Sequence, residues 1–143
     1  VTAAAPSARR EGFMVAPMRR GVAECVIGVQ RDPTFGPVVM FGLGGVHVEA
    51  LRDVVFRAAP FDEAEARRMI HEVRAIRLLT HPRGSAPADI GALARLLAQV
   101  SRLAAISPGL ASADMNPVLA LPEGEGAVIL DALLIPQAAA TAG

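Results

Sequence analysis

Three oxygen-bearing side chains near the end of the chain have the spacing of a metal site. If the apolar segments on either side of residues 122–126 pair as a hairpin, Asn116 lies nearly opposite Asp131, with Cβ atoms roughly 5 Å apart. Asp114 precedes Asn116 by two residues, so it projects from the same face of the strand. Carboxylate and amide oxygens suit Mg²⁺, which keeps waters and substrate phosphates in its other positions. The alternative is that Asn116 and Pro117 form a bend and that Asp131 is a cap or an exposed edge residue.

A second polar row consists of Glu49, Asp53 and Arg57. The spacing of four residues places all three on one face of either a strand or a helix, because four is a multiple of two and is close to 3.6. The planar guanidinium of Arg57 can donate two parallel hydrogen bonds to a phosphate. The other interpretation is an exposed ladder of ion pairs with little effect on stability. The three histidines share no metal-ligand spacing, and none is assigned a catalytic role.

Strands and helices must position these side chains, and the apolar periodicity indicates where they lie. Period-two patterns and turn residues predict strands at 13–18, 24–29, 38–41, 46–56, 114–121 and 127–135. Asp62 is expected to cap a helix in which Glu65 completes a capping box and apolar residues recur at helical spacing to Ile76. Asp89 is expected to open a second helix that ends before Pro108.

The order of these elements predicts the fold class. Strands come first, two helices follow and a hairpin closes the chain, which favours an α+β fold with both helices on one face of a mainly antiparallel sheet. A chain of 143 residues is long enough for one core. We expect one domain at 12–135 between flexible tails at 1–11 and 136–143, because both ends lack apolar periodicity.

Composition argues against several classes of partner. Aromatic residues make up only 3 % of the chain, with no Trp or Tyr, which argues against base stacking. Fourteen Lys and Arg balance fourteen Asp and Glu, so no net field attracts nucleic acid or an anionic membrane. No apolar stretch reaches the roughly 20 residues of a membrane helix. The single cysteine, Cys25, lies in an apolar run typical of a buried thiol. We therefore expect a cytoplasmic protein that binds neither nucleic acid nor a membrane.

Five segments together resemble a known family. They are GFMVAPM at 12–18, ECVIGV at 24–29, RDPTFGPVVMFGLGG at 31–45, DVVFR at 53–57 and DMNPV at 114–118. Over about residues 12 to 135 the sequence resembles the ATP-grasp domain of NDP-forming acyl-CoA synthetases, a family that includes ADP-forming acetyl-CoA synthetases and related protein acetyltransferases. The block at 31–45 is the most specific part. The resemblance implies the C-terminal subdomain of an ATP-grasp fold.

The resemblance also implies ATP and Mg²⁺ as cofactors. The segment at 14–18 resembles the hinge strand whose backbone borders adenine, and Glu24 opens the next strand toward the nucleotide. The residues implied to bind the nucleotide are Val15, Ala16, Met18 and Glu24. Ala16 stands where the family usually has Gln.

The polar residues near the hairpin and at 53–57 gain roles from the same resemblance. Asn116 and Asp131 match the positions that hold Mg²⁺ in the related succinyl-CoA synthetases, and Asp114 would support them. Arg57 would face the transferred phosphate as the catalytic residue. In such enzymes ATP phosphorylates a histidine on a partner domain, the phosphate passes to an acyl group, and CoA then captures the acyl group.

The implied partners are the remainder of the ATP-grasp domain and a CoA-binding domain with the phosphohistidine. Neither is recognisable within this chain, so we expect the isolated chain to be inactive. We also expect self-association at high concentration through apolar residues near Val15, Met18 and Met40 that would lack their cover. The alternative is a non-catalytic regulatory or interaction module derived from the family, because Ser112 and Leu133 replace the usual Glu and Arg.

Overall fold

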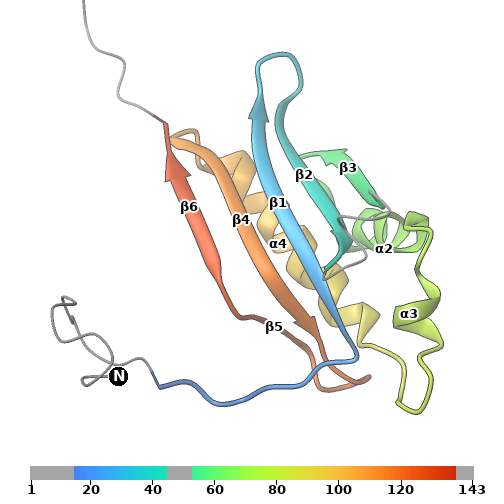
Figure 1. Ribbon diagram of the computed structural model, residues 1–143. Helices are drawn as coiled ribbons and strands as arrows, with labels where there is room; N and C mark the ends of the chain where they lie inside the picture. The colour runs from blue at the N-terminus through green and yellow to red at the C-terminus, as the bar shows by residue number, and fades with distance from the viewer. Residues whose placement is uncertain (1–14, 45–52, 138–143) are drawn as a thin grey trace, which may run out of the picture.

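A six-stranded sheet forms one layer of the protein (Figure 1). The computed structural model describes residues 15–44 and 53–137. The strands are β1 (Ala23–Asp32), β2 (Gly36–Leu43), β3 (Val54–Ala58), β4 (Leu110–Ala120), β5 (Ala127–Ile129) and β6 (Ala132–Pro136). They are ordered β3-β2-β1-β4, and both β5 and β6 pair with β4. Every pairing is antiparallel, which confirms the predicted sheet.

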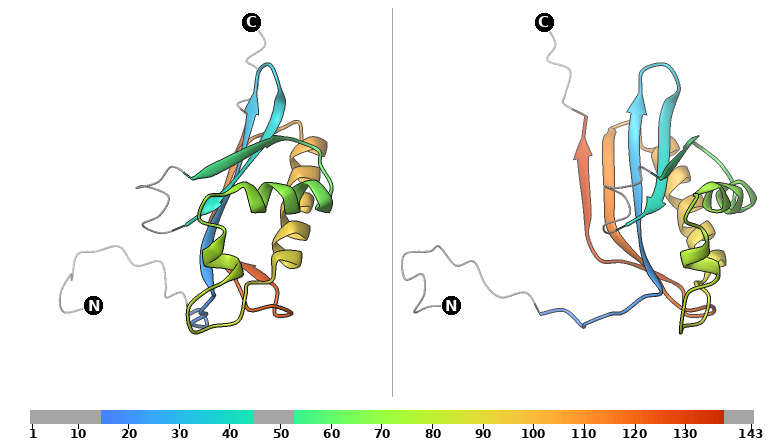
Figure 2. Two further views of the ribbon diagram at one scale, coloured as in Figure 1. Left: turned by 90° about the vertical axis from the view of Figure 1, so that its right-hand side faces the viewer. Right: turned by 45° about the vertical axis from the view of Figure 1, so that its right-hand side comes forward.

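Helices cover one face of this sheet (Figure 2). They are α2 (Glu63–Glu72), the short α3 (Arg77–Thr80) and α4 (Ile90–Ile106). The predicted N-caps are present: Asp62 accepts a hydrogen bond from the Glu65 amide, and Asp89 accepts one from the Ala92 amide, both at 2.8 Å. The α+β class, with helices packed on one face, is thus confirmed.

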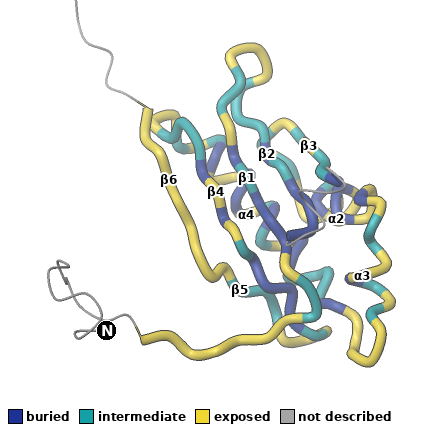
Figure 3. Tube along the Cα trace, viewed as in Figure 1, coloured by how far each residue is buried: buried dark blue, intermediate teal, exposed yellow. Residues whose placement is uncertain are grey.

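Alternation along the two central strands builds the core. Side chains at odd positions of β1 and β2 are buried beneath α2 and α4: Cys25, Ile27, Val29, Val39, Phe41 and Leu43. Figure 3 shows this burial in dark blue along the middle of the sheet. Burial raises the pKa of the Cys25 thiol to about 12, so the thiol stays protonated at neutral pH.

The opposite side of the sheet, called the open face below, is not covered by a helix of the described chain (Figure 2). Strand pairing places on it Gly28 of β1, Met40 of β2, Phe56 of β3 and Asp114 of β4, in one row across the sheet. Phe56 is 57 % exposed, so this face presents apolar as well as polar side chains to solvent.

Three strand predictions were wrong in extent. Residues 15–18, expected to belong to a strand, form no regular structure, and Val15 and Met18 are 94 % and 95 % exposed. The strand predicted at 46–56 lies partly outside the described residues, and β3 begins only at Val54. The last predicted strand is split between β5 and β6 because its partner opposite Leu130 is Pro117, which has no N–H to donate to the ladder.

The helix and tail predictions also need correction. Glu65 does not complete a capping box, since its carboxylate pairs with arginines instead, and α2 ends at Glu72 rather than near Ile76. Pro136 ends β6 and the Gln137 amide donates to a carbonyl at 2.8 Å, so the sheet extends into the predicted C-terminal tail. The predicted N-terminal tail lies outside the described residues. Among the helices of residues 15–44 and 53–137, none is long and apolar enough to cross a membrane.

Candidate functional site

Two polar side chains project from the middle of the open face. Along β4, Ala113 and Met115 are buried under the helices, whereas Asp114 and Asn116 between and after them are exposed. This period of two follows from the pleat of a strand. Because β4 pairs with β1 on one side and with β5 and β6 on the other, both side chains stand inside the sheet rather than at its rim.

The closing hairpin places Asp131 beside Asn116. The Asn116 amide donates to the Asp131 carbonyl oxygen at 3.2 Å, and the pairs on either side keep the same register. The predicted facing of these two residues is therefore confirmed. Residues directly opposite in an antiparallel pair project to the same face, so Asn116 and Asp131 share the open face with Asp114.

The Asp131 carboxylate is exposed and only partly engaged. Its Oδ1 accepts a hydrogen bond from the Ala132 amide at 2.8 Å. The described residues provide no hydrogen bond to Oδ2. One carboxylate oxygen thus stays available to a ligand on the open face.

This arrangement can hold a hard cation only with help from a ligand. Over the described ranges 15–44 and 53–137, no three His, Cys, Asp or Glu side chains form a group that could bind a metal. The open face offers one amide and two carboxylates, from Asn116, Asp131 and Asp114. Mg²⁺ suits such a set because it binds through one or two carboxylates and takes its other ligands from water and phosphates.

The turn of this hairpin is anchored to the start of α4. Asp89 Oδ2 accepts the amides of Gly124 and Gly126, each at 3.2 Å, while Oδ1 caps the helix at Ala92. The turn glycines have φ of 83° and 94°, a left-handed conformation that favours glycine. These backbone hydrogen bonds, with the Ala92 amide first, lower the pKa of Asp89. One carboxylate thereby connects the helix layer to the hairpin that carries Asp131.

The depressed pKa of Asp89 predicts a pH-dependent contribution to stability. Because the folded carboxyl binds its proton more weakly than the unfolded one, its contribution is complete above the unfolded pKa of about 4 and is lost as the pH falls through the folded pKa. We expect Asp89→Ala to lower the free energy of unfolding by about 1 kcal/mol at pH 7. As the pH falls below about 4, the free energy of unfolding of the variant should decrease less than that of the wild type. Urea titrations from pH 7 to pH 2.5 measure this, with Glu123→Ala in the same turn as control. Parallel pH curves for Asp89→Ala and the wild type would contradict the assignment.

The implied nucleotide-binding residues lie at one end of the sheet. Val15, Ala16 and Met18 are exposed in the segment that leads into β1. Glu24 is exposed at the start of β1, and its carbonyl accepts the Gly44 amide at 2.6 Å. The close contact explains the glycine, because a Cβ at position 44 would lie 3.1 Å from Glu24. This hydrogen bond joins the beginning of β1 to the residue that follows β2.

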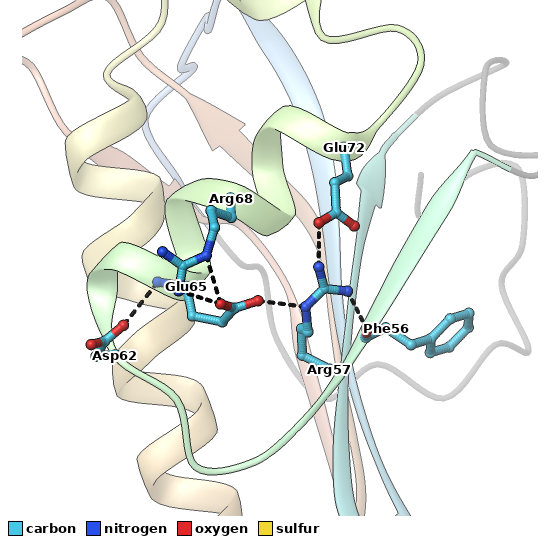
Figure 4. Close-up of polar contacts among 6 residues, drawn as sticks. All are labelled: Phe56, Arg57, Asp62, Glu65, Arg68 and Glu72. Carbon is cyan, nitrogen blue, oxygen red and sulfur yellow. Dashed lines mark hydrogen bonds and ion pairs between the residues drawn. The ribbon is translucent and has the colours of Figure 1, made fainter.

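Arg57 lies on the helix-covered face, away from Asn116 and Asp131. It pairs with Val39, whose side chain is buried under the helices. Its Nε donates to Glu65 Oε1 at 2.7 Å, its Nη2 contacts Glu72, and its Nη1 donates to a backbone carbonyl, as Figure 4 shows. The two glutamates raise the pKa of Arg57, with the Glu65 hydrogen bond as the largest cause. The structure therefore does not bring Arg57 to the candidate metal ligands.

The other members of the second polar row do not extend it to the open face. Asp53 is buried and accepts the amides of Arg74 and Ala75 at 2.9 and 2.8 Å, so it satisfies backbone donors after α2. Glu49 lies outside the described residues. Within the described part of the row, Asp53 and Arg57 fasten β3 to the helix layer.

A depression beside Glu24 collects residues that no sequence motif singles out. It measures about 820 Å³ and brings Arg77, His81 and Arg83 next to Glu24 and Gly44. The lining residues come from three separate segments of the chain, at 22–24, 43–44 and 77–85. Only the packing of α3 against the ends of β1 and β2 brings them together.

Comparison with known families decides the assignment of this open-faced sheet. A family model described as "ATP-grasp domain" matches residues 1–135. The chain belongs to the ATP-grasp domain family. The match covers all described β-strands of this ATP-grasp chain except the last residue of β6.

Relatives of this ATP-grasp chain are ligases that join an acid to CoA. Over 123 residues it is 48 % identical to the Archaeoglobus fulgidus "Acetate--CoA ligase [ADP-forming] I", covering 86 % of this chain and 18 % of that protein. It is 45 % identical to the Pyrococcus furiosus "Acetate--CoA ligase [ADP-forming] II subunit beta", covering 91 % of this chain and 56 % of that subunit. The chain thus spans between about a fifth and about half of these relatives.

Solved structures show the same fold. "PH1788 from Pyrococcus horikoshii Ot3" superposes with a TM-score of 0.81 at 42 % identity, over 95 % of this chain and 57 % of that one. The Ca. Korarchaeum cryptofilum "dinucleotide forming Acetyl-coenzyme A synthetase 1", in complex with coenzyme A and Mg-AMPPCP, superposes with a TM-score of 0.77 at 47 % identity, over 84 % of this chain and 55 % of that one. The α+β sheet described above therefore has the same fold as the corresponding parts of PH1788 and of the Korarchaeum synthetase.

Proposed function

We propose that this chain provides the metal-binding surface and part of the nucleotide-binding surface of an ADP-forming acyl-CoA synthetase. The observation that carries the proposal is the register that sets Asn116 opposite Asp131, with Asp114 beside them, on a face that no helix of residues 15–44 and 53–137 covers. The Korarchaeum synthetase was solved in complex with Mg-AMPPCP, which supports a nucleotide and Mg²⁺ as ligands of the corresponding domain.

The proposed reaction has three transfers. The γ-phosphoryl group of ATP passes to a histidine of a partner domain and ADP leaves; the phosphoryl group then passes to the carboxylate of an acid; the CoA thiol finally displaces phosphate from the acyl phosphate. Phosphoryl transfer depends on positioning and on stabilisation of charge. Mg²⁺, when bound, neutralises phosphate charge. In this chain Asn116 and Asp131 would hold it, and Asp114 would orient its waters.

The nucleotide would lie along the open face toward the start of β1. In this proposal the backbone of Val15, Ala16 and Met18 borders the adenine, and Glu24 faces the nucleotide. High exposure of this segment supports the proposal, because Val15 and Met18 have no cover from the described chain. The cover would come from the remainder of the ATP-grasp domain.

Arg57 would reach the transferred phosphate only after a rearrangement. Its guanidinium would have to leave Glu65 and Glu72 and pass the edge of β3, since it lies on the helix side of the sheet. Without that movement its contribution is to hold α2 against β3. The proposed catalytic role therefore depends on a second conformation of this side chain.

A non-catalytic module derived from the family is the alternative function. It is favoured by Ser112 and Leu133, which lie on the open face of the hairpin and carry no charge to bind a metal or a phosphate. The two functions differ in whether the complete assembly turns over ATP.

The test compares the purified chain with the chain joined to the missing parts. Alone, it is expected to release no ADP in response to acid and CoA, because half a site cannot enclose the triphosphate. Joined to an upstream ATP-grasp half and a CoA-binding domain with its histidine, it is expected to release ADP when both acid and CoA are present. Acid- and CoA-dependent ADP release by the chain alone would contradict the expected incompleteness. An assembly that binds its parts but never phosphorylates the histidine would favour the non-catalytic module.

A further inference from the structure

The two edges of the sheet differ in how well they are protected. At one edge β3 carries Arg57, whose ion pairs hold α2 beside the strand. At the other edge β6 has the sequence Ala-Leu-Leu-Ile-Pro, with no charged residue, and all five residues are exposed (Figure 3). Proteins usually protect an edge with charges, bulges or covering elements, because its free backbone groups can pair with another strand. Among the described strands, β6 has β4 on one side and no partner on the other.

Backbone directions identify the group that points outward from β6. The Asp131 carbonyl oxygen accepts a hydrogen bond from the Asn116 amide of β4, and the Gln137 amide donates to the Gly109 carbonyl before β4. The backbone N–H and C=O groups of odd-numbered residues here therefore point toward β4. In an antiparallel ladder the backbone N–H and C=O groups of successive residues point in opposite directions. The backbone groups of Ala132, Leu134 and Pro136 therefore point to the free edge. The Ala132 amide donates a hydrogen bond to Asp131 Oδ1 at 2.8 Å. The Leu134 amide is thus the outward donor without a partner in the described chain.

We propose that β6 is a dimerisation edge, where it pairs antiparallel with β6 of a second copy of this chain about a two-fold axis at Leu134. Each Leu134 amide then donates to the Leu134 carbonyl of the other copy. In this register Asp131 of one copy faces Gln137 of the other copy rather than a second carboxylate. No like charges therefore lie opposite each other across the dimer contact. A two-fold contact uses the same edge on both copies and therefore closes at the dimer.

An apolar groove on the helix side of the sheet adds to the apolar surface that this dimer would bury, beyond that of the paired strands themselves. The groove measures about 310 Å³, lies between α4 and the hairpin, and is lined by residues such as Leu96, Val100, Leu103, Ile129 and Leu134. Leu103 and Leu134 are 45 % and 56 % exposed. In the antiparallel dimer the Leu134 side chains of the two copies contact each other, at the point where the groove of one copy adjoins the groove of the other. Burial of this apolar surface favours association without any charged contact.

The dimer would also fix the relation between two functional surfaces. The two-fold axis of an antiparallel strand pair runs perpendicular to the sheet, so both open faces lie on the same side of the joined sheet. Asp131 immediately precedes β6, which places both candidate metal sites next to the seam. The dimer itself requires neither metal nor nucleotide, so its test is independent of the proposed function.

The first experiment measures mass against concentration by light scattering, without nucleotide. The wild type is expected to rise from 14.8 kDa to a plateau at twice that value. Leu134→Pro removes the outward amide without removing a bond to β4, and should weaken association about tenfold or more. Phe56→Ser is the control, because Phe56 is 57 % exposed on the opposite edge strand. A plateau unchanged by Leu134→Pro, or one abolished by Met18→Ser instead, would overturn the proposal, as would a wild type that stays monomeric or grows without limit.

The second experiment tests the register by a cross-link. At the two-fold axis the Cα atoms of position 134 in the two copies are about 5.5 Å apart, within the range of a disulfide. Oxidised Leu134→Cys is therefore expected to form a covalent dimer, whereas Phe56→Cys is expected to remain mostly monomeric. The native Cys25 is buried and adds no background. Equal cross-linking of the two variants would show random collision and contradict an ordered edge, and circular dichroism of each variant checks that the fold is kept.

Discussion

Asp131→Ala is expected to slow phosphorylation of the partner histidine at least about a hundredfold in the assembled synthetase. The change removes a carboxylate that faces Asn116 on the open face, where it would hold the cation against the phosphates. The fold should be kept, with the free energy of unfolding within about 0.5 kcal/mol of the wild type, because Asp131 is exposed and its contacts are local. Transfer of labelled γ-phosphate from ATP to the protein measures the rate.

The control for this variant is Glu123→Ala, which removes an exposed carboxylate from the turn of the same hairpin. It should leave both the transfer rate and the stability close to those of the wild type. Raising the Mg²⁺ concentration should restore part of the activity of Asp131→Ala if the defect is metal affinity. Near-normal transfer by Asp131→Ala at low Mg²⁺ would show that the pair of Asn116 and Asp131 is not the metal site.

Phe41→Ala is expected to cause the largest loss of stability, about 3–5 kcal/mol. Phe41 of β2 is fully buried in the core beneath the helices, and its truncation leaves a cavity that the strands paired on both sides cannot fill. A loss of this size is comparable to much of the total stability of a small domain. Urea unfolding followed by circular dichroism measures it.

The matched control is Phe56→Ala on the neighbouring strand β3. Phe56 pairs with Met40 and lies on the open face, so its truncation should change the stability by about 0.5 kcal/mol or less. Similar losses for both variants would mean that the open face is covered in solution. That outcome would contradict the assignment of the two faces of the sheet.

Local signals in the sequence were enough to predict the helix starts and the hairpin register. Asp62 and Asp89 cap their helices through amides only three residues away, so no distant part of the chain is needed to define these ends. The turn at 122–126 determines which residues of the hairpin face each other, and the alternation then assigns Asn116 and Asp131 to one face. These contacts depend on short stretches of chain, which is why they could be read without a structure.

Local signals were insufficient where a distant element competes for a side chain. The glutamate expected to complete a capping box binds arginines instead, because β3 brings Arg57 within reach of Glu65. Likewise, the apolar pattern at 13–18 resembles a strand, yet Val15 and Met18 have no strand to pair with in the described chain. A sequence pattern records what a segment could bury, and not whether a partner is present.

The fold class, the capped helices and the meeting of Asn116 with Asp131 follow from the sequence alone, because each rests on periodicity or on contacts between residues close in the chain. Which face of the sheet the helices cover depends on tertiary packing. A spacing of four predicts one side for Asp53, which directly precedes β3, and for Arg57 within it, but both sides of an isolated strand are equivalent until α2 packs against one of them. That packing turned a predicted phosphate-facing arginine toward two glutamates, and left the opposite face open beside Asp131.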